Sequence, residues 1–169
     1  MRIHDAEQGS DEWFRLRAGL PTASEASKLI TSAGAESKSM SDYAEILAGA
    51  KFAGRPLDQW GGNKHTERGH ELEPDARQAY AFVCDQNVKQ VGFCTDDMEQ
   101  YGASPDGMCG DDGLVEIKCL SAKYHIKALM YYKKHNRAPT DYIAQCQMQM
   151  VVCERQWCDL TYWPRLGWR

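Results

Sequence analysis

Residues 105–118 have the sequence PDGMCGDDGLVEIK, which predicts a β-hairpin with charged side chains on one face. The dipeptide Asp112-Gly113 is typical of a tight hairpin turn in which both central residues need positive φ. A hairpin folded at that turn places Asp106 opposite the segment from Glu116 to Lys118. Because side chains alternate along a strand, Glu116 and Lys118 share one face, and their apolar neighbours point into a core on the other.

These charged residues have the chemistry of a metal-dependent hydrolase. Two carboxylates held close together repel each other unless a proton or a cation lies between them. Magnesium suits such a place, because it takes hard oxygen ligands and commonly binds one or two carboxylates together with substrate phosphates. Lys118 could orient or help deprotonate an attacking water. Asp106, Glu116 and Lys118 therefore indicate phosphodiester hydrolysis, although Glu-x-Lys on a strand is also explained by a solvated face with a weak ion pair.

Length and composition limit the class of protein. The chain has 169 residues, 43% of them hydrophobic, so we expect one domain spanning residues 1–169. The sequence contains no apolar run of about 18 residues and no basic leader, so a soluble, cytoplasmic protein without membrane association is expected. The seven cysteines include no Cys-x-x-Cys pair, which favours reduced thiols over a zinc or iron–sulfur site.

The charges are segregated along the chain. The net charge of -4 argues against a protein that coats nucleic acid nonspecifically. Residues 91–116 contain seven acids and no Lys or Arg, whereas residues 117–140 contain six Lys or Arg and no acid. We interpret this pattern as an acidic metal pocket beside a basic strip.

Apolar spacing and capping signals predict helices that are separated by a group of short strands. Ser10 caps a first helical turn that Gly19 closes, and residues 22–25 form a capping box for a helix over about residues 23–31. Further helices are expected at about 41–52, 66–84, 122–135 and 140–154, strands at about 89–95, 101–106, 114–119 and 157–163, and loops at about 32–39 and 61–63. This order predicts an α/β (α+β) fold in which helices flank a central mixed sheet.

Several motifs, taken in their order along the chain, resemble one nuclease family. The motifs are QGSDEW (8–13), LRAG (16–19), TASE (22–25), EPDAR (73–77), SPDG (104–107), EIKC (116–119) and YIAQCQ (142–147). Together they resemble the phage lambda-type 5′-3′ exonucleases, the viral recombinase and alkaline exonuclease family of the PD-(D/E)xK superfamily. The resemblance covers nearly the whole chain and implies a restriction-endonuclease-like core.

The resemblance implies an activity that depends on Mg²⁺, with two ions at the site and Mn²⁺ as a possible substitute. Such an enzyme digests the 5′-ended strand of duplex DNA from its ends, leaving a 3′ overhang for phage-type recombination by strand annealing. Carried over by position, Asp106, Glu116, Glu73 and the backbone carbonyl of Ile117 are expected metal ligands. Lys118 is expected to position the attacking water.

The resemblance also implies a site that holds the 5′-phosphate of the DNA end. Its expected residues are Arg17, Ser24, Ser104 and Gln145, which offer an arginine fork and neutral donors to phosphate oxygens. From the sequence itself, Ser24 is equally explained by helix capping, and Gln145 by an exposed helical face shared with Gln149.

The basic strip could grip the DNA backbone through Lys123, Lys127 and Arg137. A plain amphipathic helix with a basic outer face explains the same residues.

The expected partners are double-stranded DNA ends, a phage single-strand annealing protein and further copies of the chain in a ring-shaped trimer. Members of the family usually continue beyond the final strand, so this chain is either naturally short or truncated, and trimer formation is left open. Two other functions remain. One is a PD-(D/E)xK endonuclease, and the other is a non-catalytic protein that binds DNA ends.

Overall fold

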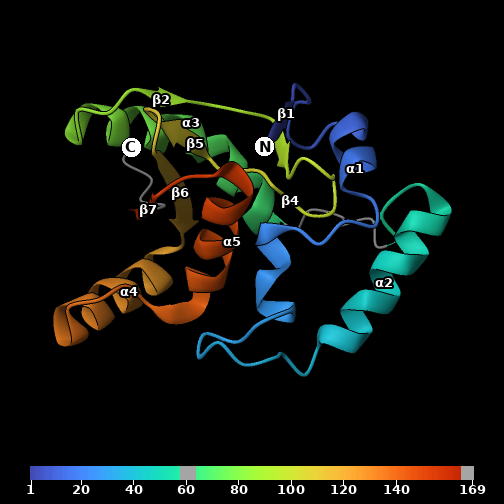
Figure 1. The fold of residues 1–169 in the computed structure, drawn as a ribbon. Coiled ribbons are helices and arrows are strands. Elements are labelled where there is room, and N and C mark those ends of the chain that lie inside the picture. Colours follow the sequence, from blue (N-terminus) through green and yellow to red (C-terminus); the bar gives the residue numbers. More distant parts are fainter. Residues whose placement is uncertain (58–63, 165–169) are drawn as a thin grey trace.

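The computed structural model describes residues 1–57 and 64–164, and the side chains of residues 64–70 are also left undescribed. The loop expected at 61–63 lies outside this part. The elements, in chain order, are β1 (Arg2–His4), α1 (Asp11–Arg17), the 3-10 helix η1 (Ala23–Lys28), α2 (Met40–Ala53), α3 (Lys64–Val83), β2 (Val88–Lys89), β3 (Phe93–Thr95), β4 (Gly102–Ala103), β5 (Gly107–Cys109), β6 (Gly113–Leu120), α4 (Ala122–His135), the 3-10 helix η2 (Thr140–Tyr142), α5 (Ile143–Cys153) and β7 (Trp157–Pro164) (Figure 1). Within this part of the chain, no helix has the length and apolar character needed to cross a membrane.

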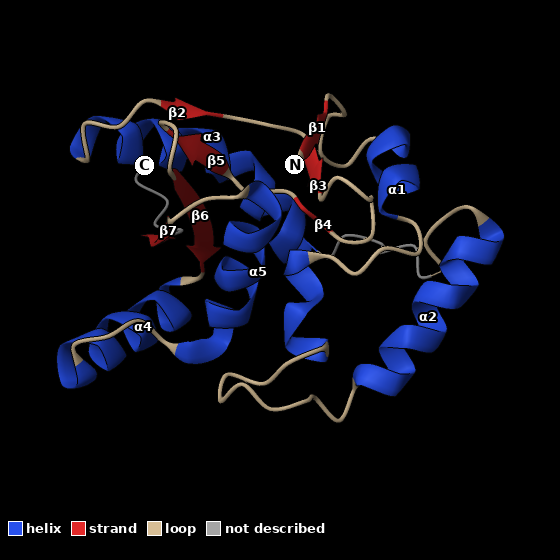
Figure 2. Cartoon of the chain, viewed as in Figure 1, coloured by secondary structure: helices blue, strands red, loops and turns tan. Residues whose placement is uncertain are grey.

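The strands form two sheets, of which the larger one is mixed, as expected (Figure 2). Its order is β2-β5-β6-β7, with β5 and β6 antiparallel and β6 and β7 parallel. Parallel neighbours need a long crossover, and α4, η2 and α5 supply it. The smaller sheet has the order β1-β3-β4 and is antiparallel.

Helices cover both faces of the central strand β6. Val115 and Ile117 pack with Ala76 and Tyr80 of α3 on one face. Leu114 is fully buried on the other face, in a cluster that includes residues from the C-terminal end of α5. Glu116 and Lys118 alternate with the α3-facing residues, so they share the α5 side of the strand with Leu114, as predicted.

The N-terminal elements agree with the sequence only in part. Helix α1 is confirmed, because the Ser10 side chain accepts a hydrogen bond from the Trp13 amide. The α-helix expected over residues 23–31 is wrong, because Ala23–Lys28 forms a 3-10 helix without a side-chain cap from Thr22. The Thr22 hydroxyl accepts a hydrogen bond from Arg17 and contacts Ser24, which explains why it does not cap the helix.

The single strand expected over residues 89–95 is also wrong, because it is divided between the two sheets as β2 and β3. The chain changes sheet around Gly92, where a Cβ atom would collide with the carbonyl oxygens of His4 and Ala6. The strand expected at 101–106 is reduced to β4, and β1 and β5 were not predicted. The α4 helix has the predicted bounds. The helix expected at 140–154 begins with the 3-10 turn η2, so α5 starts at Ile143.

The hairpin has the predicted register but a different turn. Gly107 pairs with Val115 and Cys109 with Gly113, so the next pair along the ladder brings Asp106 to Glu116. The residue with positive φ is Gly110 (φ 57°), and neither Asp112 nor Gly113 has positive φ. Gly113 is needed for space, because a Cβ atom there would collide with the indole ring of Trp157 on β7.

We therefore expect Gly113→Ala to destabilise the protein by roughly 1–3 kcal/mol, the usual range for overpacking a core. Chemical denaturation would measure the difference. Asp111→Ala is the control, because Asp111 is exposed in the same turn. Equal stability of Gly113→Ala and the parent chain would contradict the close contact with Trp157.

Candidate active site

The hairpin brings Asp106, Glu116 and Lys118 together, as the sequence predicted. Asp106 lies in the segment before β5, and its Oδ2 accepts a hydrogen bond from the backbone amide of Ile117 at 2.5 Å. The Lys118 Nζ lies 2.5 Å from Glu116 Oε1. Asp106 is 9% exposed and Glu116 only 2%, so these carboxylates are withdrawn from solvent. A solvated strand face is therefore excluded as the explanation of Glu-x-Lys.

Two glutamines of α5 hold the buried Glu116 carboxylate. The Gln145 amide donates to Oε1 and the Gln149 amide to Oε2, each at 2.6 Å. Gln149 is 1% exposed, so the exposed helical face considered for these residues is wrong. Gln149 was not among the predicted site residues, although its i,i+4 spacing from Gln145 places both side chains on one face of a helix.

We expect Gln149→Met to destabilise the protein by about 1–3 kcal/mol, because a buried carboxylate oxygen loses its donor. Thermal or urea unfolding in the absence of metal would measure the change. Gln147→Met is the matched control, since Gln147 is exposed on the same helix. An effect of the same size in both variants would show that the Glu116 contact is unimportant.

Glu73 enters from α3 and is linked to the hairpin through Arg77. The Arg77 Nη2 lies 2.7 Å from Glu73 Oε1, and its Nε donates to the backbone carbonyl of Asp106 at 2.6 Å. Arg77 was not among the predicted site residues. The signal that could have found it is its i,i+4 spacing from Glu73, which favours an ion pair on a helix.

The carboxylates affect one another electrostatically. Burial is the main cause that raises the pKa of Asp106 well above its usual range, and the charges of Glu116 and Glu73 raise it further. Burial would lower the pKa of Lys118, but Glu116 and Asp106 outweigh it and the pKa rises. Lys118 is thus a charged ammonium, whose Nζ also lies 4.6 Å from the centre of the Tyr142 ring.

The carboxylates of the site fit magnesium for two reasons. Their oxygens are the hard ligands that magnesium prefers, and a bound cation would relieve the repulsion between them. Among the side chains that the structure describes, in residues 1–57 and 71–164, no group of three or more His, Cys, Asp or Glu could hold a metal ion by itself. Magnesium tolerates this, because it usually keeps several waters and takes phosphate oxygens from its substrate. All seven cysteines are outside disulfide bonds.

A second cluster gathers around Arg17. Its guanidinium lies 4.0 Å from the centre of the Trp13 ring, and Nη2 donates to Thr22 and to Ser24 at 3.2 and 3.1 Å. The Trp13 indole donates to the Ser104 hydroxyl at 2.9 Å. Burial lowers the pKa of Arg17 to about 10, so the side chain remains charged near neutral pH.

The predicted phosphate residues are therefore divided. Arg17, Ser24 and Ser104 belong to one connected group, whereas Gln145 is bonded to Glu116. Trp13 belongs to the QGSDEW motif but was not predicted to have a role of its own. The fold shows that its ring joins Arg17 to Ser104.

The basic strip is exposed. Lys123 and Lys127 lie on α4, Arg137 follows it, and all are exposed. This helix directly follows β6 in the chain and extends away from the central sheet at the lower left of Figure 1. Ala128 is its one buried residue.

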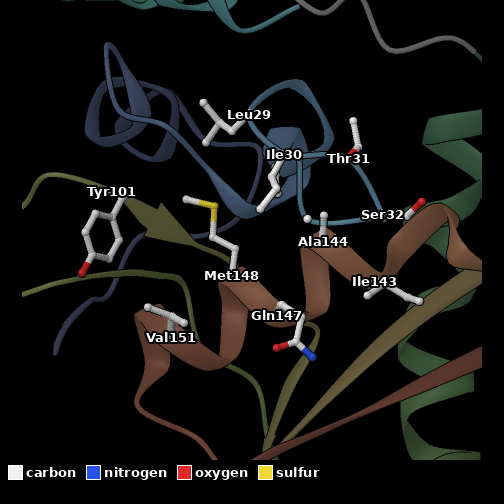
Figure 3. A pocket seen from close by; sticks show the side chains of 12 residues that line it. Leu29, Ile30, Thr31, Ser32, Tyr101, Ile143, Ala144, Gln147, Met148 and Val151 are labelled. Carbon is white, nitrogen blue, oxygen red and sulfur yellow. The ribbon is translucent and has the colours of Figure 1, made fainter. Parts of the chain in front are cut away.

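A groove of about 460 Å³ lies along a different face of α5 from the one that carries Gln145 and Gln149. Its lining differs from that of the charged site. Figure 3 shows Leu29 and Ile30 facing Ala144 and Met148 across it. Its lining residues include no Asp, Glu, Lys, Arg or His.

Residues 12–156 match the model of a family described as the YqaJ-like viral recombinase domain. Among solved structures, an alkaline exonuclease (LHK-Exo) from Laribacter hongkongensis is 34% identical with a TM-score of 0.78, covering 92% of this chain and 75% of that one. LHK-Exo in complex with dAMP is 36% identical with a TM-score of 0.77, covering 94% and 76%. A phage related exonuclease from Haemophilus somnus 129PT is 19% identical with a TM-score of 0.64, covering 87% and 70%, and shares the fold. No curated protein sequence gives a significant match.

Proposed function

This chain belongs to the YqaJ-like viral recombinase family, and its fold is similar to that of an alkaline exonuclease. On these grounds we propose a specific reaction. The protein is a magnesium-dependent exonuclease that digests the 5′-ended strand of duplex DNA in the 5′ to 3′ direction. The observation that carries this proposal is the convergence of Asp106, Glu116 and Lys118 from one hairpin at a buried position. The relative LHK-Exo binds dAMP, a mononucleotide of the kind that hydrolysis of a DNA strand releases.

The proposed metal ligands are the carboxylates of Asp106, Glu116 and Glu73 and the backbone carbonyl of Ile117. Two magnesium ions bound there, or manganese in their place, would supply Lewis-acid stabilisation of the negative charge on the scissile phosphate. Lys118 orients the attacking water, because its ammonium is held beside Glu116. Gln149 holds the second oxygen of the Glu116 carboxylate, Oε2, whereas Lys118 contacts Oε1.

The proposed end-recognition site is the cluster of Arg17, Ser24 and Ser104. A charged guanidinium with neighbouring hydroxyl groups is a suitable receptor for a terminal 5′-phosphate. Gln145 joins them when DNA binds, by exchanging its hydrogen bond to Glu116 for one to phosphate. A strand held by its 5′-phosphate presents its first phosphodiester bonds to the carboxylates, which explains 5′ to 3′ digestion and the remaining 3′ overhang.

Beyond the site, we propose that Lys123, Lys127 and Arg137 contact the DNA backbone. Their exposure and the absence of acidic residues from 117 to 140 support this role. The 3′ overhang would serve a phage single-strand annealing protein in recombination, and a ring-shaped trimer would keep the enzyme on DNA. These partners follow from the family resemblance.

Three DNA substrates test the proposal: linear duplex with 5′-phosphate ends, the same duplex with 5′-hydroxyl ends, and closed circular duplex. We expect magnesium-dependent release of mononucleotides from linear DNA, fastest with 5′-phosphate, and none from the circle or in EDTA. Cutting of the circle would favour the endonuclease. Binding of ends without nucleotide release would favour the non-catalytic protein.

A further inference from the structure

We propose that Arg77 is a positioning residue that sets the placement of Glu73 relative to Asp106, and thereby the affinity of the site for a divalent cation. This inference rests on the proposed function and adds a residue that binds neither metal nor DNA. Its role is to hold the metal ligands in place.

One guanidinium connects three separate parts of the chain. Arg77 donates through Nη2 to Glu73 on α3, through Nε to the backbone carbonyl of Asp106, and through Nη1 to the Gln90 side chain at 3.1 Å. Gln90 lies between β2 and β3, which belong to different sheets. The side chains of Arg77 and Glu73 are only 12% and 15% exposed, so water competes weakly for the contacts with Glu73 and the Asp106 carbonyl, whereas the contact with Gln90 is exposed.

The three contacts require an arginine. Its donors lie in one rigid plane and point in fixed directions, whereas a lysine offers a single flexible point charge. Glu73 and Arg77 are one turn apart on the same helix, so the contact with the Asp106 carbonyl couples the position of α3 to that of the Asp106 backbone. The Asp106 carboxylate is bonded to the Ile117 amide of β6 on the other side. Asp106 is therefore tied to both of the elements that carry the other carboxylates.

The sign of the change in metal affinity distinguishes positioning from simple electrostatics. A positive charge beside a cation site repels the cation, so removing Arg77 would tighten metal binding if charge alone mattered. If Arg77 orients the ligands, its removal weakens binding, and losing such an orienting partner typically costs about 10–100-fold in metal affinity.

The test measures Mn²⁺ binding to the DNA-free chain of 169 residues by isothermal titration calorimetry. We expect the Kd of Arg77→Gln to rise about tenfold or more, and that of Arg77→Lys to rise as well despite its retained charge. Arg155→Gln is the matched control, because Arg155 is also partly buried but donates to the Cys153 carbonyl at the far end of α5. Its Kd should equal that of the parent chain.

An unchanged or lower Kd in a folded Arg77→Gln protein would overturn the inference. If thermal unfolding in EDTA shows that Arg77→Gln does not fold, the Kd of Arg77→Lys is used instead. A Kd equal to that of the parent chain in Arg77→Lys would then overturn the inference. Failure of the proposed function looks different, because the parent chain would then bind Mn²⁺ without degrading linear DNA, or would bind no Mn²⁺ at all. Cleavage by the parent chain together with parental Kd values in the Arg77 variants would reject only the role of Arg77.

Discussion

Asp106→Asn is expected to reduce cleavage of linear duplex DNA on the order of 10³-fold or more, because it removes the charge of a proposed metal ligand beside the scissile phosphodiester bond. Asparagine has nearly the same shape and keeps an oxygen that can accept the Ile117 amide hydrogen bond. The loss should therefore appear in kcat without loss of the fold. Steady-state release of mononucleotides from 5′-phosphorylated duplex would measure it.

The same variant should be at least as stable as the parent chain when metal is absent. Burial, followed by the charges of Glu116 and Glu73, raises the pKa of Asp106 in the folded state. A raised folded pKa means that stability is highest below the unfolded pKa of about 3.9 and falls as pH rises toward the folded pKa. Asparagine does not titrate, so its advantage in melting temperature should grow as the pH rises above about 3.9 toward the raised folded pKa of Asp106.

Asp111→Asn is the control for the Asp106 variant, because it makes the same chemical change at an exposed position in the hairpin turn. It should retain parental activity and stability. Full cleavage by Asp106→Asn would remove Asp106 from the metal site. Lower stability at every pH would mean that the carboxylate is favourably placed in the metal-free protein.

Arg17→Met is expected to abolish the preference for phosphorylated ends. Methionine can retain part of the packing against Trp13 while removing the guanidinium that would bind the phosphate. Charge-assisted hydrogen bonds are worth about 1.5–3 kcal/mol, so kcat/KM for 5′-phosphate ends should fall roughly 10–100-fold. The value for 5′-hydroxyl ends should change little.

Arg15→Met controls for the loss of an arginine from the same helix, because Arg15 is exposed and the described hydrogen bond of its side chain goes to the Asp11 carbonyl. It should leave both substrates unaffected. An equal fall on phosphate and hydroxyl ends in Arg17→Met would mean that Arg17 supports the fold or general DNA binding instead of reading the end.

Local sequence rules predicted the elements whose structure depends on neighbouring residues. The α4 helix has the expected bounds, and β6 alternates its two faces as a strand must. The same rules failed where distant residues intervene. Thr22 was predicted to cap a helix, but in the fold its hydroxyl accepts a hydrogen bond from Arg17. Residues 89–95 were predicted to form one strand. In the fold, Gly92 lies against the backbone of His4 and Ala6, and the chain passes there from one sheet to the other.

The convergence of Asp106, Glu116 and Lys118 could be predicted from the amino-acid sequence, because a β-hairpin needs only local pairing and strand alternation. The sequence also carries the motifs by which the family is recognised. The residues that support the site became visible in the folded chain, where Gln149 bonds Glu116, Arg77 links Glu73 to Asp106, and Trp13 joins Arg17 to Ser104. The physical reason is that these contacts join elements distant along the chain, whose meeting depends on how the helices pack on the two faces of the sheet.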